Sequence, residues 1–193
     1  SVSAAANDLV NLTASEAGSA ANHYTLTVTG SSASAADLLN LDGKTDLNVL
    51  AAGVTTITGS AADVAAVVSA STIDTASAVN VTVTGTNATA QNISDLNTIN
   101  SKTKGAITAS VSAAANDLVN LTASEAGSAA NHYTLTVTGP SASAADLLNL
   151  DGKTDLNVLA AGVTTITGSA ADVAAVVRSE EHTSELQSRQ YLV

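Results

Sequence analysis

Short runs of β-branched residues recur along the chain, and each is followed by a glycine and then by apolar residues at helical spacing. The clearest case is residues 54–68, VTTITGSAADVAAVV. This stretch opens with β-branched residues only, which favours an extended strand over a helix, and Gly59 permits a sharp turn. Val64, Val67 and Val68 then share one face of a helix. The stretch therefore predicts a strand, a tight turn and a short helix.

Ser60 and Asp63 predict where this helix begins. The Ser60 hydroxyl can accept a hydrogen bond from the amide of the third helical residue, and the Asp63 carboxylate can reach back toward the N-terminus, in a capping-box pattern. A helix of this length is not stable alone in water. We therefore expect it to pack against the strand that precedes it.

The helix signature Asp-(Leu/Val)-x-x-(Leu/Val/Ile) recurs at a mean spacing of about 27 residues, within the range typical of solenoids and other repeat arrays. A carboxylate is favourable in the first turn of a helix, so we interpret these aspartates as capping groups and not as a carboxylate ladder. They are Asp8, Asp37, Asp63, Asp95, Asp117, Asp146 and Asp172.

A longer repeat lies above this spacing. Residues 1–68 recur as residues 110–177, 109 positions later, with Ser31 replaced by Pro140 as the single difference. Tandem duplication of a four-unit block explains this near-identity, although mis-assembly of a repetitive gene would also produce it. Pro140 lies in a predicted strand-to-helix turn, where a missing amide donor is harmless. We interpret residues 1–177 as one repeat array.

Strands and helices that alternate at a fixed period predict right-handed crossovers and a parallel sheet. The fold class is therefore α/β, and we expect a solenoid of strand–turn–short helix units, each of which buries its apolar faces against its neighbours. Tandem immunoglobulin-like β-sandwich domains are the alternative, because 109 residues is also the size of such a domain. We favour the solenoid because the Ser-Ala-Ala-Asp segments are too rich in alanine and too well capped for strands.

The alternating residues of the strands predict two faces of the sheet. Apolar residues such as Ile57 would point toward the helices, and the threonines between them would point outward. Stacking would align these threonines into two columns, which the shorter unit at residues 106–112 would break. This regular polar face resembles those of ice-binding β-solenoids and could also bind surface glycans. The preference of threonine for exposed strand positions is the simpler explanation. The threonines are Thr27, Thr29, Thr56, Thr58, Thr82 and Thr84.

Two identical loops each carry three side chains with oxygen ligands. Calcium prefers such ligands, although the spacing differs from that of an EF-hand loop. These loops are therefore candidate calcium sites, and the alternative is a solvated Asx-turn at the end of a helix. The residues are Asp42, Asp46 and Asn48 in the first loop and Asp151, Asp155 and Asn157 in the second.

No pattern in the sequence indicates a catalytic site, so we expect that the chain is not an enzyme. His23 and His132 recur once per block, with no cysteine and no serine–acid arrangement nearby, so they do not predict a catalytic triad. We expect them at the rim of the array, packed in the loop before a strand. Neither a glycine-rich phosphate loop nor a nucleophile elbow occurs.

Composition and charge narrow the range of partners. Acidic residues outnumber basic ones by 17 to 6, which argues against binding to nucleic acid or to an anionic membrane. The sequence has no apolar run of about 18 residues, so we expect no membrane insertion. Because the chain lacks Phe, Trp, Met and Cys, its core must come from small aliphatic residues, which suits thin repeat layers.

Both ends of the sequence have unusual features. No methionine and no signal peptide opens the chain, which indicates a cut. The repeat stops after Val177, and Arg178–Ser188 resembles the in-frame translation of a high-throughput sequencing adapter. We therefore expect residues 178–193 to be a non-native tail and exclude them from functional reasoning.

Three phrases, VTTITGSAADVAAVV, ISDLNTINSKTKGAITAS and ASAADLLNLDGKTDLN, resemble repeats of very long bacterial, especially cyanobacterial, cell-surface and haemolysin-type proteins. The resemblance covers residues 1–177. It implies a secreted or cell-surface location and a part in adhesion or motility. The Gly-Gly-x-Gly-x-Asp nonapeptide that binds calcium in those proteins is absent here, so calcium binding does not follow from the resemblance.

Two functions follow from these observations. The first is a structural spacer whose partners are the neighbouring repeats of the same chain, because the sequence is nearly all repetition. The second is a ligand-binding module that uses the threonine face or the aspartate loops.

Overall fold

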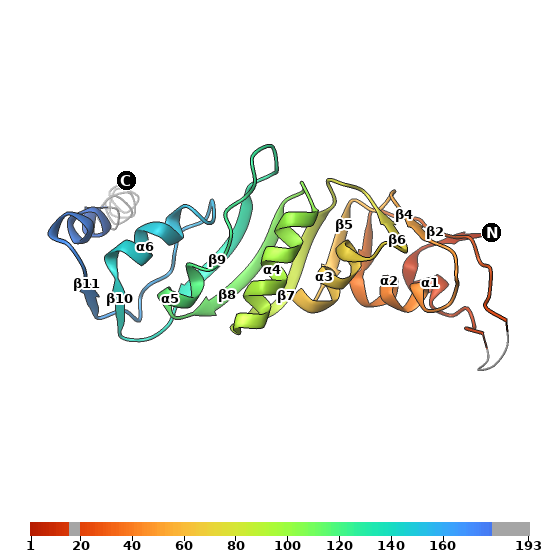
Figure 1. Ribbon diagram of the computed structural model, residues 1–193, viewed down its shortest axis with the longest axis horizontal. Coiled ribbons are helices and arrows are strands. Elements are labelled where there is room, and N and C mark those ends of the chain that lie inside the picture. Colours follow the sequence, from red (N-terminus) through yellow and green to blue (C-terminus); the bar gives the residue numbers. More distant parts are fainter. Residues whose placement is uncertain (16–19, 179–193) are drawn as a thin grey trace, which may run out of the picture.

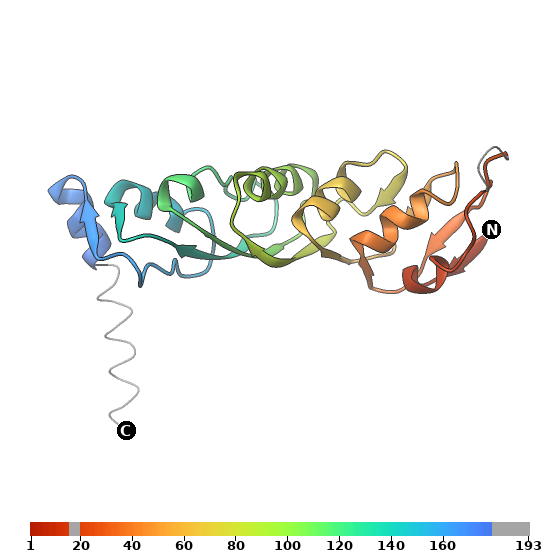
Figure 2. The ribbon, with the colours of Figure 1, turned by 90° about the horizontal axis from the view of Figure 1, so that it is seen from below.

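The computed structural model describes residues 1–15 and 20–178 and shows an elongated α/β molecule (Figure 1). The chain advances along the long axis from the N-terminus, drawn in red, to the last described helix, drawn in blue (Figure 2). All strand pairs are parallel. The predicted α/β class with parallel strands is confirmed, and the immunoglobulin-like alternative is wrong because the Asp-Leu segments are helical and the sheets are not antiparallel.

Strands and short helices follow one another along the described residues. The strands are β1 (Val2–Ala4), β2 (Leu26–Val28), β3 (Ser32–Ser34), β4 (Val49–Ala51), β5 (Thr56–Gly59), β6 (Ile73–Thr75), β7 (Asn80–Asn87), β8 (Ile107–Ala113), β9 (Asn131–Val137), β10 (Ser141–Ser143) and β11 (Thr165–Thr167). The helices are α1 (Ala6–Leu9), α2 (Ala35–Asp42), α3 (Ala61–Ser69), α4 (Ala90–Lys102), α5 (Ala115–Leu118) and α6 (Ala144–Asp151), and residues 170–178 are also helical.

The strands form three sheets, with the orders β1-β2-β4-β6, β3-β5-β7-β8-β9 and β10-β11. Opposite residues of neighbouring strands are 23 to 26 positions apart, as in the pairs Leu26–Val49 and Val81–Ile107. This spacing is shorter than the mean aspartate spacing. The helices α2, α3 and α4 each follow two strands, and these two strands lie in different sheets.

The core is aliphatic, as the composition predicts. Every apolar strand residue that was expected to face the helices is buried, and so are the apolar stripes of α2 and α4 and, in α3, Val64 and Val67, whereas Val68 is half-buried. The strand residues are Leu26, Val28, Ile57, Val81 and Val83. Because each helix is short, its stability comes from this packing and not from helix propensity.

The helix caps differ in detail from the prediction. The Ser60 hydroxyl accepts from the amide of Asp63 as expected, but the Asp63 carboxylate accepts from that same hydroxyl at 2.7 Å and does not complete a capping box. The complete box occurs at Thr89 and Asn92, in α4. Asp95 was therefore wrongly predicted as a capping residue: it lies past the first turn, and its carboxylate accepts from Gln91.

Gly59 also has a different role from the predicted sharp turn. Its φ is not positive, and a Cβ added there would lie 2.9 Å from the Cβ of Ala35. Glycine is needed because β5 and the start of α2 approach closely.

Candidate functional site

The predicted calcium loop of the first block leaves α2 and runs to β4. Asp42 is the last residue of the helix, and Asn48 is exposed just before the strand. The carboxylate of Asp46 contacts a side chain outside this loop, because its Oδ1 lies 2.7 Å from Nδ1 of His23. The imidazole of His23, 23 positions earlier in the chain, therefore lies beside a carboxylate that was expected to bind calcium.

The second block repeats this arrangement. Asp151 ends α6, Asn157 is exposed, and a carboxylate oxygen of Asp155 lies 2.7 Å from Nδ1 of His132. Among the described residues, no group of three or more His, Cys, Asp or Glu side chains is placed to hold a metal ion. A calcium role for these loops stays a prediction.

A threonine hydroxyl, and not an Asx-turn, organises each loop. The hydroxyl of Thr45 lies 3.0 Å and 2.8 Å from the carbonyl oxygens of Asn22 and Tyr24, and it accepts from the amide of Leu47 at 3.1 Å. Thr154 makes the same contacts in the second block. Thr103, which follows α4, donates to the carbonyl of Val79 and accepts from the amide of Gly105. Each hydroxyl thus connects a loop to a segment 21 to 24 positions earlier in the chain.

A second threonine contact occurs before β5 and before β11. The hydroxyl of Thr55 donates to the carbonyl of Ser31 at 2.9 Å, and that of Thr164 donates to the carbonyl of Pro140 at 3.1 Å. Backbone amides of the same two turns reach the same oxygens at 2.9 to 3.1 Å. The replacement of Ser31 by Pro140 keeps this carbonyl, so the same hydrogen bonds to it form in both blocks.

The predicted threonine columns are only partly formed. Thr58 lies opposite Thr82, and Thr82 lies opposite Thr108, so these side chains share one row of the five-stranded sheet. Thr56 lies opposite Asn80.

Other threonines of the set lie elsewhere. Thr27 belongs to the four-stranded sheet, opposite Ser3 and Leu50, and Thr29 lies beyond the end of β2. Thr84 lies where the register between β7 and β8 shifts. The expectation of two continuous columns is wrong, because the short strands divide the threonines between two sheets.

His23 is an exposed residue in the loop before β2, as expected, whereas His132 lies within β9 and not in a loop before a strand. The side chain of His23 is 72% exposed and that of His132 is 41% exposed, and each pairs with the aspartate of the next loop. Among the described residues, neither histidine is hydrogen-bonded to a nucleophilic side chain such as serine or threonine. Their shared geometry is a link between successive segments.

Tyr133 is the one described side chain that is buried with an unpartnered polar atom. The residue is fully buried in β9, and its hydroxyl has no hydrogen-bond partner among the described residues. Burial raises the pKa of this phenol well above its usual value. Its counterpart Tyr24 is only half-buried.

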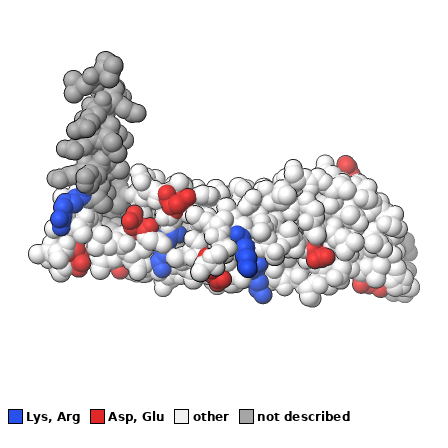
Figure 3. Space-filling model, turned by 90° about the horizontal axis from the view of Figure 1, so that it is seen from above, with Lys and Arg blue, Asp and Glu red and all other residues white. Residues whose placement is uncertain are grey.

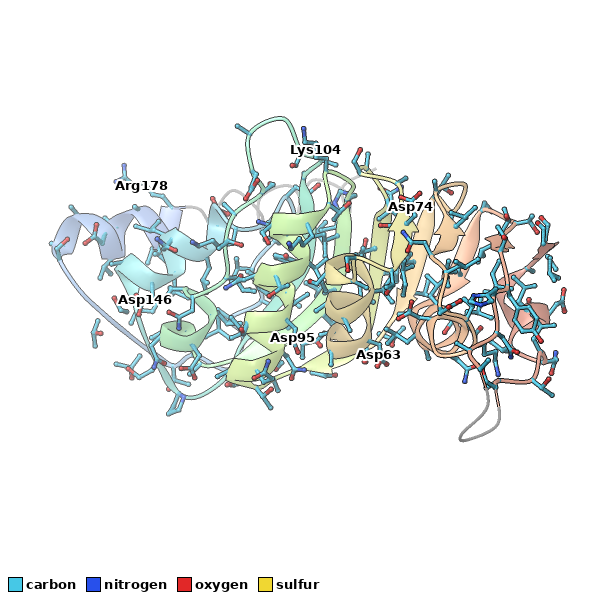
Figure 4. All side chains as sticks on the ribbon, turned by 45° about the vertical axis from the view of Figure 1, so that its right-hand side comes forward. Asp63, Asp74, Asp95, Lys104, Asp146 and Arg178 are labelled. Carbon is cyan, nitrogen blue, oxygen red and sulfur yellow. The ribbon has the colours of Figure 1, made fainter. Side chains whose placement is uncertain are left out.

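Charged side chains of the described residues are spread over the face drawn in Figure 3 without forming one large patch, and those labelled in Figure 4 lie apart along the length of the molecule. An open depression of about 290 Å³ lies between α4 and α5. Of the described helices, none has the length and apolar character needed to cross a membrane.

Asparagines of α4 make contacts that the sequence analysis missed. The Asn97 side chain donates to the carbonyl of Asn120 at 2.9 Å and accepts from the amide of Thr122 at 2.8 Å. Asn100 donates to the carbonyl of Ala123 at 3.0 Å. The sequence held no signal for these contacts, because their separation of 23 to 25 positions, close to the register spacing, becomes visible only once the strands are paired.

No protein-family model, curated protein or solved structure matches this chain.

Proposed function

We propose that this chain is a structural spacer, a solenoid segment of a large secreted or cell-surface bacterial protein that takes part in adhesion or motility. The observation that carries the proposal is the use of its polar side chains. Two of the candidate aspartates, Asp46 and Asp155, pair with a histidine of the preceding segment, and the hydroxyls of Thr45 and Thr55 and the side chain of Asn97 make further contacts between neighbouring segments.

The separations along the chain support this interpretation. The pair His23–Asp46 spans 23 positions, the contact of Thr55 with Ser31 spans 24, and the contact of Asn97 with Asn120 spans 23. Neighbouring strands pair at 23 to 26 positions, so side chains and backbone follow the same step. A repeated side-chain contact that matches the strand register strengthens the interface between neighbouring units.

The energetics also suit a spacer. A net hydrogen bond contributes roughly 1 kcal/mol, and the burial of a valine or leucine side chain about 2 kcal/mol. Each thin unit has few of either, but a unit in the middle of a stack gains them on both sides. Stability then grows with the number of units. A chain with this property can be lengthened by adding further copies of the same repeat.

Enzymatic activity is not part of the proposal. The histidines, threonines and asparagines with defined geometry recur in both blocks or contact a neighbouring segment, and the aspartate loops are occupied by contacts to His23 and His132. A reaction would need a singular arrangement of such groups.

The test is a length series. Chains with one, two and three added copies of residues 1–109 ahead of Ser1 are compared with the original chain by small-angle X-ray scattering and chemical denaturation. We expect the longest dimension to grow by a constant increment per copy and the denaturation midpoint to rise. Added blocks of scrambled sequence and equal composition are the control. Copies that unfold independently and leave the midpoint unchanged would contradict the proposal.

A further inference from the structure

Five described residues of the first block have identical counterparts in the second block that are more buried. Each is partly exposed in the first block and buried in the second, where its exposed fraction is 8% or less. The pairs are Val2 and Val111, Ala4 and Ala113, Leu12 and Leu121, Asn22 and Asn131, and Tyr24 and Tyr133. Since the sequences are the same, the difference comes from what lies beside them.

In the second block, residues of the preceding segment cover this surface. Val111 of β8 lies opposite Asn87 of β7, and the Asn87 side chain donates to the carbonyl of Ser110 at 3.0 Å. Tyr133 lies opposite Ala109. The cover thus comes from the strand β7 and the first half of β8, which both belong to residues 69–109.

Helix α4 completes the cover. Asn97 binds the backbone of Asn120 and Thr122, and Asn100 reaches Ala123. The buried Asn131 donates its side-chain amide to Asn100 at 3.0 Å. These contacts fix the loop after α5 and the start of β9.

The first block has the same groups without this cover. Asn22 turns back onto its own loop, where its amide donates to Ser15 and its side chain to the carbonyl of Thr13. Residues 22–25 are not in a strand, whereas their counterparts 131–134 belong to β9. On its outer side β1 has no strand partner among the described residues. The surface is therefore an unpaired sheet edge beside a partly exposed apolar patch.

We propose that this surface of the first block, defined by Val2, Ala4, Leu12, Asn22 and Tyr24 and here named the N-terminal face, docks another copy of segment 69–109. In this complex β7 of the bound copy pairs with β1, as β7 pairs with β8 inside the chain. Asn97 and Asn100 of the bound copy contact residues 11–14, the counterparts of residues 120–123. The inference rests on the proposed spacer function and names the partner that a stack of blocks would place on this face. The interface inside the chain supplies its geometry.

The test uses the full chain with one added copy of residues 1–109 ahead of Ser1, so that a copy of segment 69–109 comes directly before the N-terminal face. Tyr24→Phe in the added block leaves the original Tyr24 as the reporter. Nitration by tetranitromethane, followed by mass analysis of peptides, measures the exposure of each tyrosine. Tyr133 is the protected reference within the same molecule.

We expect Tyr24 to react readily in the original chain. In the extended chain its rate should fall by about tenfold or more, since reaction would then require local opening of the interface. The matched control carries Asn97→Ala and Asn100→Ala in the added block only, and it should restore most of the reactivity. A Tyr24 that reacts equally fast in the original and extended chains overturns the inference. Scattering data on the same protein report separately on the spacer function, because blocks can add length without burying Tyr24.

Discussion

The side-chain amide of Asn131 donates a 3.0 Å hydrogen bond to the side-chain oxygen of Asn100, and both residues are almost completely buried. This contact joins α4, from the segment that occurs once, to the start of β9 in the repeated block. A buried amide without a partner is costly, so each asparagine depends on the other. The pair specifies how the second block sits on the segment before it.

Asn100→Ala should destabilise the chain by about 2 kcal/mol or more, because it leaves the buried Asn131 amide unpaired and removes the contacts to Thr122 and Ala123. Urea denaturation measures the change. Asn40→Ala, at an exposed position of α2, is the control and should alter stability little. Equal effects of the two substitutions would show that the buried pair contributes nothing.

Tyr133 predicts a loss of stability at alkaline pH. Burial raises its pKa in the folded chain above the ordinary value of 10.0. The unfolded chain therefore loses this proton first, and stability falls as the pH rises past about 10. Tyr133→Phe removes an unpartnered hydroxyl, so it should leave neutral stability unchanged or slightly higher and flatten the alkaline decline. Denaturation curves from pH 8 to 11 measure both effects, with Tyr24→Phe as the control. An unaltered decline in Tyr133→Phe would exclude this tyrosine as its cause.

Thr45→Val should cost about 1 kcal/mol, because the isosteric methyl can neither donate to the carbonyls of Asn22 and Tyr24 nor accept from Leu47. Amide hydrogen exchange at Leu47 should accelerate in the same variant. Thr45→Ser keeps the hydroxyl and should preserve the protection of that amide. If the serine variant exchanges as fast as the valine variant, the hydroxyl is not what holds the loop.

Gly105→Ala should destabilise the chain by about 2 kcal/mol, since a Cβ at this position would overlap the backbone carbonyl of Val79 and force a shift of the chain. Gly53 is the matched control, because a Cβ there meets no atom within 4 Å. Gly53→Ala should be neutral or slightly stabilising. Thermal unfolding of the two variants side by side measures the difference, and a neutral Gly105→Ala would contradict the close packing.

Millimolar calcium should leave the melting temperature unchanged. Asp46 and Asp155 already pair with His23 and His132, and a cation that binds only the folded chain would raise the melting temperature by mass action. The measurement compares calcium with magnesium and with a chelator. A rise of several degrees that is specific to calcium, and that Asp46→Asn reduces, would establish the loops as metal sites.

The helices were predictable because their signals are local. The stripe of Val64 and Val67 and the cap at Ser60 both lie within one element, and the structure places α3 there. The strands β4 and β6 were not predicted, because three residues such as Val49–Ala51 are too few to show an alternating pattern. The threonine contacts at Thr45 and Thr55 were missed because a hydroxyl does not reveal its distant partner.

The sheets could not be assigned from the repeat alone. Residues Val2–Ala4 recur as 111–113, yet the first copy lies in the four-stranded sheet and the second in the five-stranded sheet. The reason is that neighbouring strands are mostly 24 positions apart, whereas the blocks are offset by 109, which is not a multiple of 24. Identical residues therefore lie in different sheets.

The single difference between the blocks indicates where the sequences of repeated copies can change without loss of a contact. Ser31 and Pro140 contribute only a main-chain oxygen to the turn that follows, so no function of the side chain there is visible to selection. A substitution at this position keeps the hydrogen bonds of the turn, whereas a substitution at Asn100 would break buried contacts and one at Gly105 would force a backbone shift. Copies of the block should first differ at positions such as 31 and 140, where only main-chain atoms make the contacts.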